Sequence, residues 1–213
     1  MGQGAAEVSQ PDPTKPASGL VFVLSGPSGV GKSTLIDLLK SDGFPISHCV
    51  TATTRPMRSG EQAGVHYYFL TDAEYDALLR DEQFLEHAVV HNLYRYGIPL
   101  FSLREGLRRG QDVIIAPDVQ GASTVRWKLP NAVTIFLRPP AIGELAPRLE
   151  ARGTETAEER RIRLSTAERE MQRVSEYDYV IVNHRDRLHQ ALKDLKAIIT
   201  AERLRVCRRT VTI

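Results

Sequence analysis

The segment from Gly26 to Ser33 has the residue types and the spacing that bind nucleotide phosphates. It reads Gly-Pro-Ser-Gly-Val-Gly-Lys-Ser and lies between an apolar run and a stretch with helical periodicity. Its three glycines permit a tight turn in which backbone N–H groups and a helix N-terminus point at phosphate oxygens. Lys32 is predicted to bridge the β- and γ-phosphates, and the Ser33 hydroxyl to ligate Mg²⁺. The chain is therefore predicted to bind a nucleoside triphosphate.

A loop with two arginines follows, from Thr53 to Glu61. Arg55 and Arg58, with Tyr67 a few residues later, are suited to grip a phosphomonoester, because a guanidinium matches the geometry of phosphate oxygens. The other interpretation is a pair of solvated surface arginines, which would be preferred if the phosphate loop were absent. Phosphoryl transfer needs positive charge on the donor and the acceptor phosphates, so this loop is predicted to hold the acceptor.

A third group of cations lies in the second half of the chain. Arg148 and Arg152 are four residues apart and share a helical face, Gly153 permits a hinge, and Arg163 follows on the next predicted helix. A flexible segment of this kind over a phosphate site would be a lid. The alternative is an exposed helix laced with charges, since Glu159 and Arg163 have the spacing of an i,i+4 ion pair.

The elements that position these residues alternate between strands and helices. Unbroken apolar runs predict strands buried on both faces of a parallel sheet, at Leu20–Leu24, Asp112–Ala116, Ala132–Leu137 and Tyr179–Val182. Helical periodicity predicts helices at Lys32–Leu39, Leu100–Arg108, Gly143–Glu150, about Thr156–Val174 and about Arg187–Arg203. The alternation indicates an α/β fold with right-handed βαβ connections.

The interval from Val50 to Pro99 departs from this alternation. The stretch from Val65 to Leu70 is typical of a half-exposed strand in a mixed or antiparallel sheet. Thr71 begins a capping-box pattern, which predicts a short helix directly afterwards. The interval is therefore predicted to be an insertion that binds the second substrate.

The composition is that of one compact unit. The chain has 213 residues, 42% of them hydrophobic, and its 28 Lys and Arg against 26 Asp and Glu leave a net charge of +2. No overall field thus favours nucleic acid or an anionic membrane as a partner. Cys49 and Cys207 are far apart and outside any CxxC pattern, which favours reduced thiols in the cytoplasm over a disulfide. No apolar stretch suits a membrane span or a secretory signal, and residues 1–18 are predicted to be a flexible tail.

Taken in order along the chain, several motifs resemble those of the guanylate kinases. They are SGPSGVGKST (Ser25–Thr34), TATTRPMRSGE (Thr51–Glu61), GVHYYF (Gly64–Phe69), FLEHA (Phe84–Ala88), DVQGA (Asp118–Ala122), RLEARGTET (Arg148–Thr156) and DYVIVN (Asp178–Asn183). The resemblance implies a P-loop NTPase core with a parallel sheet flanked by helices, an inserted mixed-sheet GMP-binding domain and a helical lid. It implies a domain over 19–205, with the core at 19–50 and 100–205, the insertion at about 51–99, the lid at about 148–165, and a C-terminal tail at 206–213.

The resemblance also implies a role for each matching residue. The catalytic residues would be Lys32, Arg148, Arg152 and Arg163, and Mg²⁺ would be held with ATP by Ser33 and Asp118. ATP would bind to Gly26, Pro27, Ser28, Gly29, Val30, Gly31, Lys32, Ser33, Thr34 and Asn183. Glu86 would accept hydrogen bonds from guanine N1 and N2, which adenine cannot match. The full GMP-binding set would be Thr51, Arg55, Arg58, Tyr67, Glu86, Tyr96 and Asp118.

Some positions depart from the family pattern. The segment before Gly97 is one residue longer than usual, so either Tyr94 or Tyr96 takes the phosphate role, and we prefer Tyr96 because it directly precedes the glycine. Ile98 stands where the family has a hydroxyl that helps to read guanine, and Ala116 where it commonly has an acid. The arginine loop also carries its proline, at position 56, one residue early, and Pro117 requires the preceding strand to end or bulge.

We therefore predict a cytoplasmic ATP:GMP phosphotransferase that yields ADP and GDP, with dGMP as a further candidate substrate. One alternative is a kinase of the same fold for another phosphomonoester, such as ribose bisphosphate, which Ile98 and Ala116 leave open. Another is a non-catalytic guanylate-kinase-like module that binds a partner protein, against which the intact Gly31-Lys32-Ser33 speaks. No nucleic acid or membrane partner is expected, and the chain is predicted to be a monomer or a homodimer.

Overall fold

The structure is a computed structural model that describes residues 19–90, 93–145, 157–207, 209–211 and 213. The predicted N-terminal tail lies outside these residues, as do Arg148, Arg152 and Gly153 of the predicted lid. Among the described residues, none of the helices has the length and apolar character needed to cross a bilayer.

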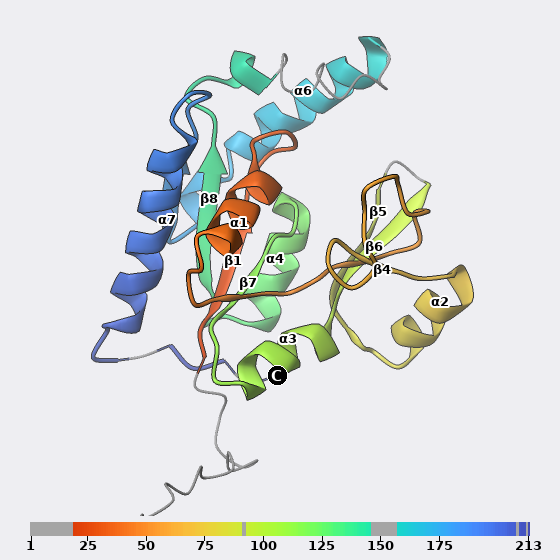
Figure 1. The fold of residues 1–213 in the computed structure, drawn as a ribbon. Coiled ribbons are helices and arrows are strands. Elements are labelled where there is room, and N and C mark those ends of the chain that lie inside the picture. Colours follow the sequence, from red (N-terminus) through yellow and green to blue (C-terminus); the bar gives the residue numbers. More distant parts are fainter. Residues whose placement is uncertain (1–18, 91–92, 146–156, 208, 212) are drawn as a thin grey trace, which may run out of the picture.

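The core is a parallel sheet with helices on both faces (Figure 1). Its strand order is β2 (Ser47–His48), β7 (Val113–Ile115), β1 (Val21–Ser25), β8 (Val133–Arg138) and β9 (Tyr179–Val182). All four neighbouring pairs are parallel. The predicted α/β class with a parallel sheet is thereby confirmed.

The apolar residues of β1 point alternately to two hydrophobic clusters. Phe22 and Leu24 pack with α1 (Lys32–Ser41) and α7 (Leu188–Arg203), whereas Val21 and Val23 pack with α3 (Leu100–Arg108) and α4 (Val119–Lys128). Because successive side chains of a strand face opposite sides, this unbroken apolar run buries both of its faces. The resulting two-sided burial fixes the central strand that leads into the phosphate loop.

A second, mixed sheet lies beside the core. Its strand order is β4 (Tyr68–Phe69), β3 (Ala52–Thr53), β6 (Tyr94–Pro99) and β5 (Phe84–Val90). β3 is parallel to β4 and antiparallel to β6, and β5 and β6 form an antiparallel hairpin. Helix α2 (Asp72–Arg80) begins with the predicted capping box, in which the Thr71 hydroxyl accepts from the Glu74 N–H and the Glu74 carboxylate accepts from the Thr71 N–H. This sheet provides the surface on which an acceptor could bind.

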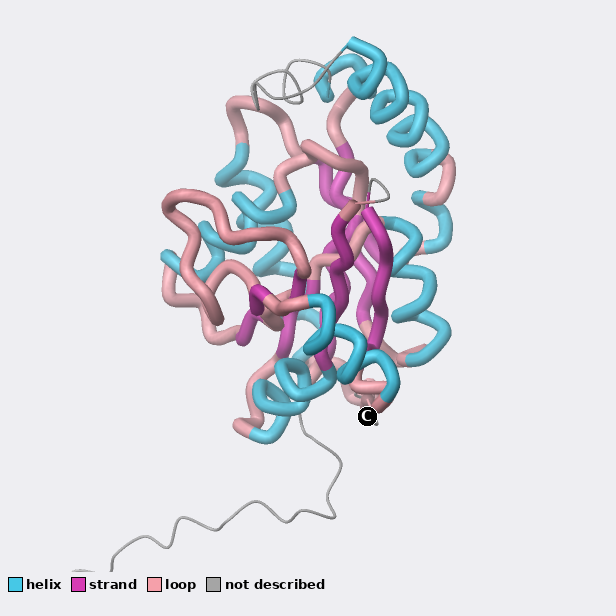
Figure 2. The backbone as a smooth tube through the Cα atoms, turned by 90° about the vertical axis from the view of Figure 1, so that its right-hand side faces the viewer, coloured by secondary structure: helices cyan, strands magenta, loops and turns pink. Residues whose placement is uncertain are grey.

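The remaining elements lie after β8. The 3₁₀-helix η1 spans Ile142–Glu144, α6 spans Ala157–Met171 and a second 3₁₀-helix, η2, spans Val174–Glu176. In both views α6 lies at the end of the molecule opposite to the C-terminus (Figures 1 and 2). Arg173, two residues after α6, joins this end to α4, because its guanidinium donates to the Ser123 hydroxyl over 2.5 Å.

Several predicted elements differ from those observed. The strand predicted over Val65–Leu70 has only two residues, Tyr68 and Phe69, since the chain turns at Gly64 and the Gly64 N–H donates to the Tyr67 carbonyl. Strand β9 is not buried on both faces, because it is an edge strand on which Val180 and Val182 stay exposed. Helix α4 and the β5–β6 hairpin were not predicted. Of the helix predicted over 143–150, the described part, up to residue 145, includes the end of η1, and the rest lies outside the description.

Candidate functional site

The phosphate loop connects β1 to α1 and takes a backbone path that only glycine adopts readily. The φ angles are +145° at Gly26, +79° at Gly29 and +103° at Gly31, a region that side chains strongly disfavour. A Cβ atom at Gly26 would lie 2.0 Å from the Leu137 carbonyl oxygen, so the loop can pass over β8 only without a side chain there. The predicted turn is thus present, with glycine required at these points.

Lys32 and the start of α1 form the cationic end of this loop. The Lys32 ammonium donates to the carbonyl of Gly26 and, over 3.3 Å, to that of Pro27, so it lies across the loop. Ser33 and Thr34 are exposed in the first turn of α1. No described side chain caps this helix, which leaves its first N–H groups and the positive end of its dipole available to an anion.

Asn183 holds the phosphate loop from the far edge of the sheet. It follows β9, is buried, and its Nδ2 donates to the Val30 carbonyl over 2.8 Å. A Cβ atom at Gly31 would lie 2.6 Å from the same Nδ2, so the amide packs directly on the loop backbone. The position predicted from the resemblance to line adenine therefore makes its described contact with the loop itself.

Arg55 is the centre of a second cationic site, on the mixed sheet. Its side chain is only 6% exposed, with its guanidinium 5.4 Å from the centre of the Tyr67 ring. Burial lowers the pKa of Arg55, but hydrogen bonds to Glu61 and Tyr96 outweigh burial, and the pKa is raised. The Tyr67 and Tyr96 rings are 6.0 Å apart. Three of the predicted GMP-binding residues are thus brought together, and it is Tyr96 that reaches Arg55.

Glu61 completes this site, although its role was not predicted from the sequence. One of its carboxylate oxygens lies 2.6 Å from the Arg55 guanidinium and the other 2.7 Å from the Arg58 N–H. These contacts lower the pKa of the Glu61 carboxyl, with the Arg55 hydrogen bond as the largest cause. The Arg58 side chain is exposed. The Glu61 carboxylate therefore lies against the positively charged guanidinium of Arg55.

Glu86 is a buried carboxylate between the mixed sheet and α4. It lies on β5 opposite Ile98 of β6 and is 8% exposed. A Cβ atom at Gly121 on α4 would come within 2.7 Å of its carboxyl carbon, so Glu86 packs against the helix backbone. Burial and then the charge of Asp118 raise the pKa of Glu86 to about 7, while Lys128 lowers it. A carboxylate kept from water in this way is suited to accept hydrogen bonds from a ligand.

Asp118 and Glu170 are two further acidic residues near Glu86 and Lys32, because the charge of Asp118 acts on Glu86 and the charge of Lys32 on Glu170. Asp118 begins α4 as its N-cap, accepting from the Gly121 N–H over 2.7 Å. Glu170, on α6, has its pKa raised to about 7, chiefly by burial; Lys32 lowers this pKa and Asp118 raises it further. The sequence did not single out Glu170, because its segment is so rich in charges that a solvated helix is the simpler interpretation. Its spacing from Ala167, which is buried, is the signal that could have found it.

For the remaining predicted site residues the structure gives fewer contacts. Thr51 is half-buried at the start of β3, where its carbonyl accepts from the Tyr68 N–H over 2.9 Å. Arg163 is half-buried on α6. Arg148 and Arg152 fall outside the described residues, so the structure says nothing of their placement.

The oxygen atoms near the phosphate loop fit Mg²⁺. Ser33 offers an exposed hydroxyl and Asp118 an exposed carboxylate, which are ligand types that Mg²⁺ prefers. The described residues contain no group of three His, Cys, Asp or Glu side chains arranged to hold a metal ion. These donors therefore fit a cation that brings phosphate oxygens and water as its other ligands.

Comparisons with known proteins identify chains that are similar to this one. A family model for guanylate kinase matches residues 18–202. The guanylate kinase of Desulfitobacterium hafniense (strain Y51) is 44% identical over 191 residues, which cover 90% of this chain and 94% of that protein. That of Sulfurimonas denitrificans (strain ATCC 33889 / DSM 1251) is 45% identical over 190 residues, covering 89% and 91%. The crystal structure of guanylate kinase from Anaplasma phagocytophilum superposes with a TM-score of 0.70 at 31% identity, covering 91% and 90% of the two chains.

Proposed function

The chain belongs to the guanylate kinase family, and from this premise we propose how its residues phosphorylate GMP at the expense of ATP. The reaction transfers the γ-phosphoryl group of ATP to the phosphate of GMP, giving ADP and GDP. The observation that carries the assignment of roles is the position of Asp118. Its carboxylate accepts from the N–H of Gly121, which packs against Glu86, and the carbonyl of the preceding Pro117 accepts from the Ser25 hydroxyl at the start of the phosphate loop. We therefore assign Glu86 and the phosphate loop to one site.

The donor side consists of the phosphate loop and α1. We assign the phosphates of ATP to the N–H groups of residues 26–34 and to Lys32, whose ammonium already lies across the loop. Asn183 would keep the loop in shape through Val30. We assign Mg²⁺ to Ser33 and Asp118; when bound, the cation would offset the charge that gathers on the transferred phosphoryl group.

The acceptor side consists of Arg55, Arg58, Tyr67 and Tyr96 around the GMP phosphate. Glu61 orients Arg55 in the present structure, and the GMP phosphate would share this guanidinium with that carboxylate. Glu86 would accept from guanine N1–H and N2–H, a paired edge that adenine lacks. Thr51 and Asp118 are assigned to the same base. With both substrates held, catalysis rests on in-line positioning and on positive charge, and requires no covalent intermediate.

We assign Arg148, Arg152 and Arg163 to a lid that closes over the phosphates and brings positive charge to them, in keeping with the spacing of these residues in the sequence. A cytoplasmic location, the use of dGMP, the choice between monomer and homodimer and the domain boundaries stay predictions. Both alternatives weighed from the sequence, a kinase for ribose bisphosphate and a non-catalytic module, are less well supported than GMP phosphorylation, because relatives named guanylate kinase cover nearly the whole chain.

The function is tested by ADP formation against AMP, GMP, dGMP, UMP and ribose bisphosphate in the presence of Mg²⁺. GMP is expected to be the best acceptor. Lys32→Ala is expected to abolish transfer with little change in stability, because a loop lysine neutralises charge and packs no core. Equal turnover of AMP and GMP would contradict the acceptor assignment, and near wild-type turnover of the Lys32 variant would contradict the donor assignment.

A further inference from the structure

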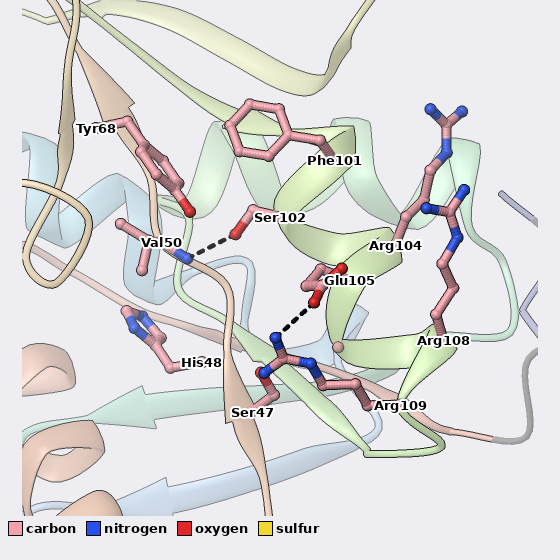
Figure 3. A pocket seen from close by; sticks show the side chains of 11 residues that line it. Ser47, His48, Val50, Tyr68, Phe101, Ser102, Arg104, Glu105, Arg108 and Arg109 are labelled. Atoms are coloured by element: carbon pink, nitrogen blue, oxygen red, sulfur yellow. Dashed lines mark hydrogen bonds and ion pairs between the residues drawn. The ribbon is translucent and has the colours of Figure 1, made fainter.

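A cavity of about 530 Å³ lies where α3 meets β2 and β4, away from the residues assigned above. We call it the α3 pocket (Figure 3). Its lining residues are Ser47, His48, Val50, Tyr68, Phe101, Ser102, Arg104, Glu105, Gly106, Arg108 and Arg109. Its volume lies within the range typical of small-molecule sites.

The pocket faces away from the acceptor site on the mixed sheet. Tyr67 and Phe69 face Arg55, whereas Tyr68, between them, contacts Phe101 of α3. Successive residues of a strand point to opposite faces, so the α3 pocket and the acceptor site lie on opposite faces of β4. A ligand in the pocket would therefore not compete with GMP for space.

The pocket also contains the two segments that join the sheets. The N–H of Val50, just before β3, donates to the Ser102 hydroxyl at the start of α3 over 3.1 Å. Helix α3 itself belongs to the core, where Leu103 and Leu107 are buried. A molecule that touches both Tyr68 and α3 would thus bridge the mixed sheet and the core.

The pocket carries excess positive charge. Of its three arginines, Arg109 is paired with Glu105 at 2.5 Å. Arg104 meets only the neutral amide of Gln83, at 3.4 Å, and within the described part of the chain neither Arg104 nor Arg108 has a carboxylate partner. The two project from one face of α3 (Figure 3), and like charges four residues apart on a helix repel each other. An anion between them would relieve this repulsion.

The other side of the pocket is aromatic. Phe101 is 44% exposed, and its ring centre lies 5.1 Å from that of Tyr68 with the planes at 66°. Burial, followed by the charge of Lys40, lowers the pKa of His48 to about 4, so at neutral pH its imidazole adds no charge to this wall. An exposed aromatic side chain next to cations is suited to hold a planar ring.

We propose that the α3 pocket is a second ligand site, for a small phosphomonoester that carries a planar ring. The phosphate would bind Arg104 and Arg108, and the ring would lie against Phe101 and Tyr68. Occupancy would fix α3 relative to β4 and thereby alter the apparent affinity for GMP on the other face of the sheet, a coupling between two sites.

The pocket is tested by NMR titration of the full chain whose substrate sites are first filled with a bisubstrate adenosine–guanosine oligophosphate. The probes are phenyl phosphate, AMP and inorganic phosphate. We expect saturable shifts of the Val50, Ser102 and Arg104 amides with the two ring-bearing probes, and at least tenfold weaker binding of inorganic phosphate. An equal affinity for all three probes would contradict the ring site, and the absence of saturable shifts would overturn the proposal.

Two variants and a control separate the contributions. The double variant Arg104→Gln/Arg108→Gln is expected to weaken the binding of phenyl phosphate at least tenfold. Phe101→Ala is expected to make phenyl phosphate bind no more tightly than inorganic phosphate. Arg80→Gln/Lys193→Gln removes the same charge from two exposed helical positions outside the pocket and should leave binding unchanged. An equal loss in the control would show that only the net charge matters, and preference for an acidic peptide over phenyl phosphate would show a protein surface instead; either result overturns the proposal.

Discussion

Glu86 is the buried polar group where the guanine is assigned. The residue directly opposite on β6 is Ile98, which is buried and offers no hydroxyl. The adjoining helix presents Gly121, so at that point the carboxylate packs against backbone. In this protein a single carboxylate therefore carries a large share of the recognition that a hydroxyl would otherwise help to provide.

Glu86→Gln is expected to weaken the binding of GMP and of its transition state by about 2–4 kcal/mol, because an amide that is partly a donor would face two guanine donors. The kcat/KM for AMP, whose adenine lacks that paired edge, should change little. The measurement is kcat/KM for both nucleotides in the wild type and the variant. An unchanged preference for GMP over AMP would place guanine recognition elsewhere.

The raised pKa of Glu86, about 7, predicts a pH dependence of GMP binding. The charged form accepts the guanine donors, so GMP should bind more weakly at pH 6 than at pH 8. The GMP phosphate also titrates near pH 6, as does Glu170 near 7. The same titration on Glu86→Gln therefore serves as the control, and the pH effect should be smaller in the variant. Equal pH profiles would show that Glu86 is not the titrating group.

The same pKa has a consequence for stability without ligand. Between pH 4.5, the ordinary value for Glu, and about 7, the folded protein holds a proton that the unfolded chain releases. The free energy of unfolding should thus fall as pH rises through this window, by about 1–3 kcal/mol from this group. Glu86→Gln should remove the loss, so it should raise the melting temperature more at pH 8 than at pH 4.5. A difference that is constant with pH would contradict this.

At the scale of elements, α4 organises the site through its first turn. Its N-cap is Asp118, and its first turn leaves room for Glu86 only because residue 121 has no side chain. Gly121→Ala would favour the helix by up to about 1 kcal/mol, yet its methyl group would meet the Glu86 carboxyl at 2.7 Å. We expect a several-fold higher KM for GMP with an unchanged KM for ATP. Gly143→Ala, where a Cβ meets nothing within 4 Å, is the control, and equal effects of the two changes would refute the packing argument.

The elements differ in how well the sequence predicts them. The β1 strand, phosphate loop and α1 follow from local spacing, and α3 has the predicted bounds. Helix α4 was missed because its segment includes Gly121, Ser123 and Thr124, which are weak helix formers. The β5–β6 hairpin was missed because Glu86 places a charge at a buried strand position, against the usual alternation.

The site residues likewise divide into those that the sequence could predict and those that it could not. Lys32 and its loop could be predicted because the motif is contiguous, and Arg55 and Glu86 because the resemblance supplied them. Glu61 and Glu170 could not, since their importance depends on partners that only the folded chain brings near, Arg55 in one case and Lys32 with Asp118 in the other.

At the scale of the whole molecule, the last described residues contact the core, although the sequence predicted a C-terminal tail from 206. The Arg209 guanidinium lies 3.1 Å from the Asp178 carboxylate, and Val211 is 4% exposed in the cluster under α3 and α4. The Thr210 carbonyl accepts from the Asn131 amide over 2.9 Å. These contacts join residues 209–211 to the segment just before β8 and to the residue just before β9.

Deleting residues 206–213 is therefore expected to cost about 2–4 kcal/mol of unfolding free energy, through a lost buried side chain and an ion pair. Deleting residues 2–18, a polar and proline-containing segment, is expected to leave the melting temperature and activity nearly unchanged. Thermal unfolding of both truncated chains checks the pair. A larger drop in melting temperature after the N-terminal deletion than after the C-terminal deletion would contradict this prediction.

The contact of Asn183 with Val30 spans 153 positions of the chain, and this has a consequence for biosynthesis. The phosphate loop leaves the ribosome early, but β7 and β8, which flank β1, come much later, and the asparagine that supports the loop comes later still. Because contacts far apart in sequence form only after the intervening chain is made, a nascent chain that ends before β9 lacks a finished nucleotide site. ATP can therefore stabilise this protein only near the end of its translation, and the unfinished chain must stay intact without that help.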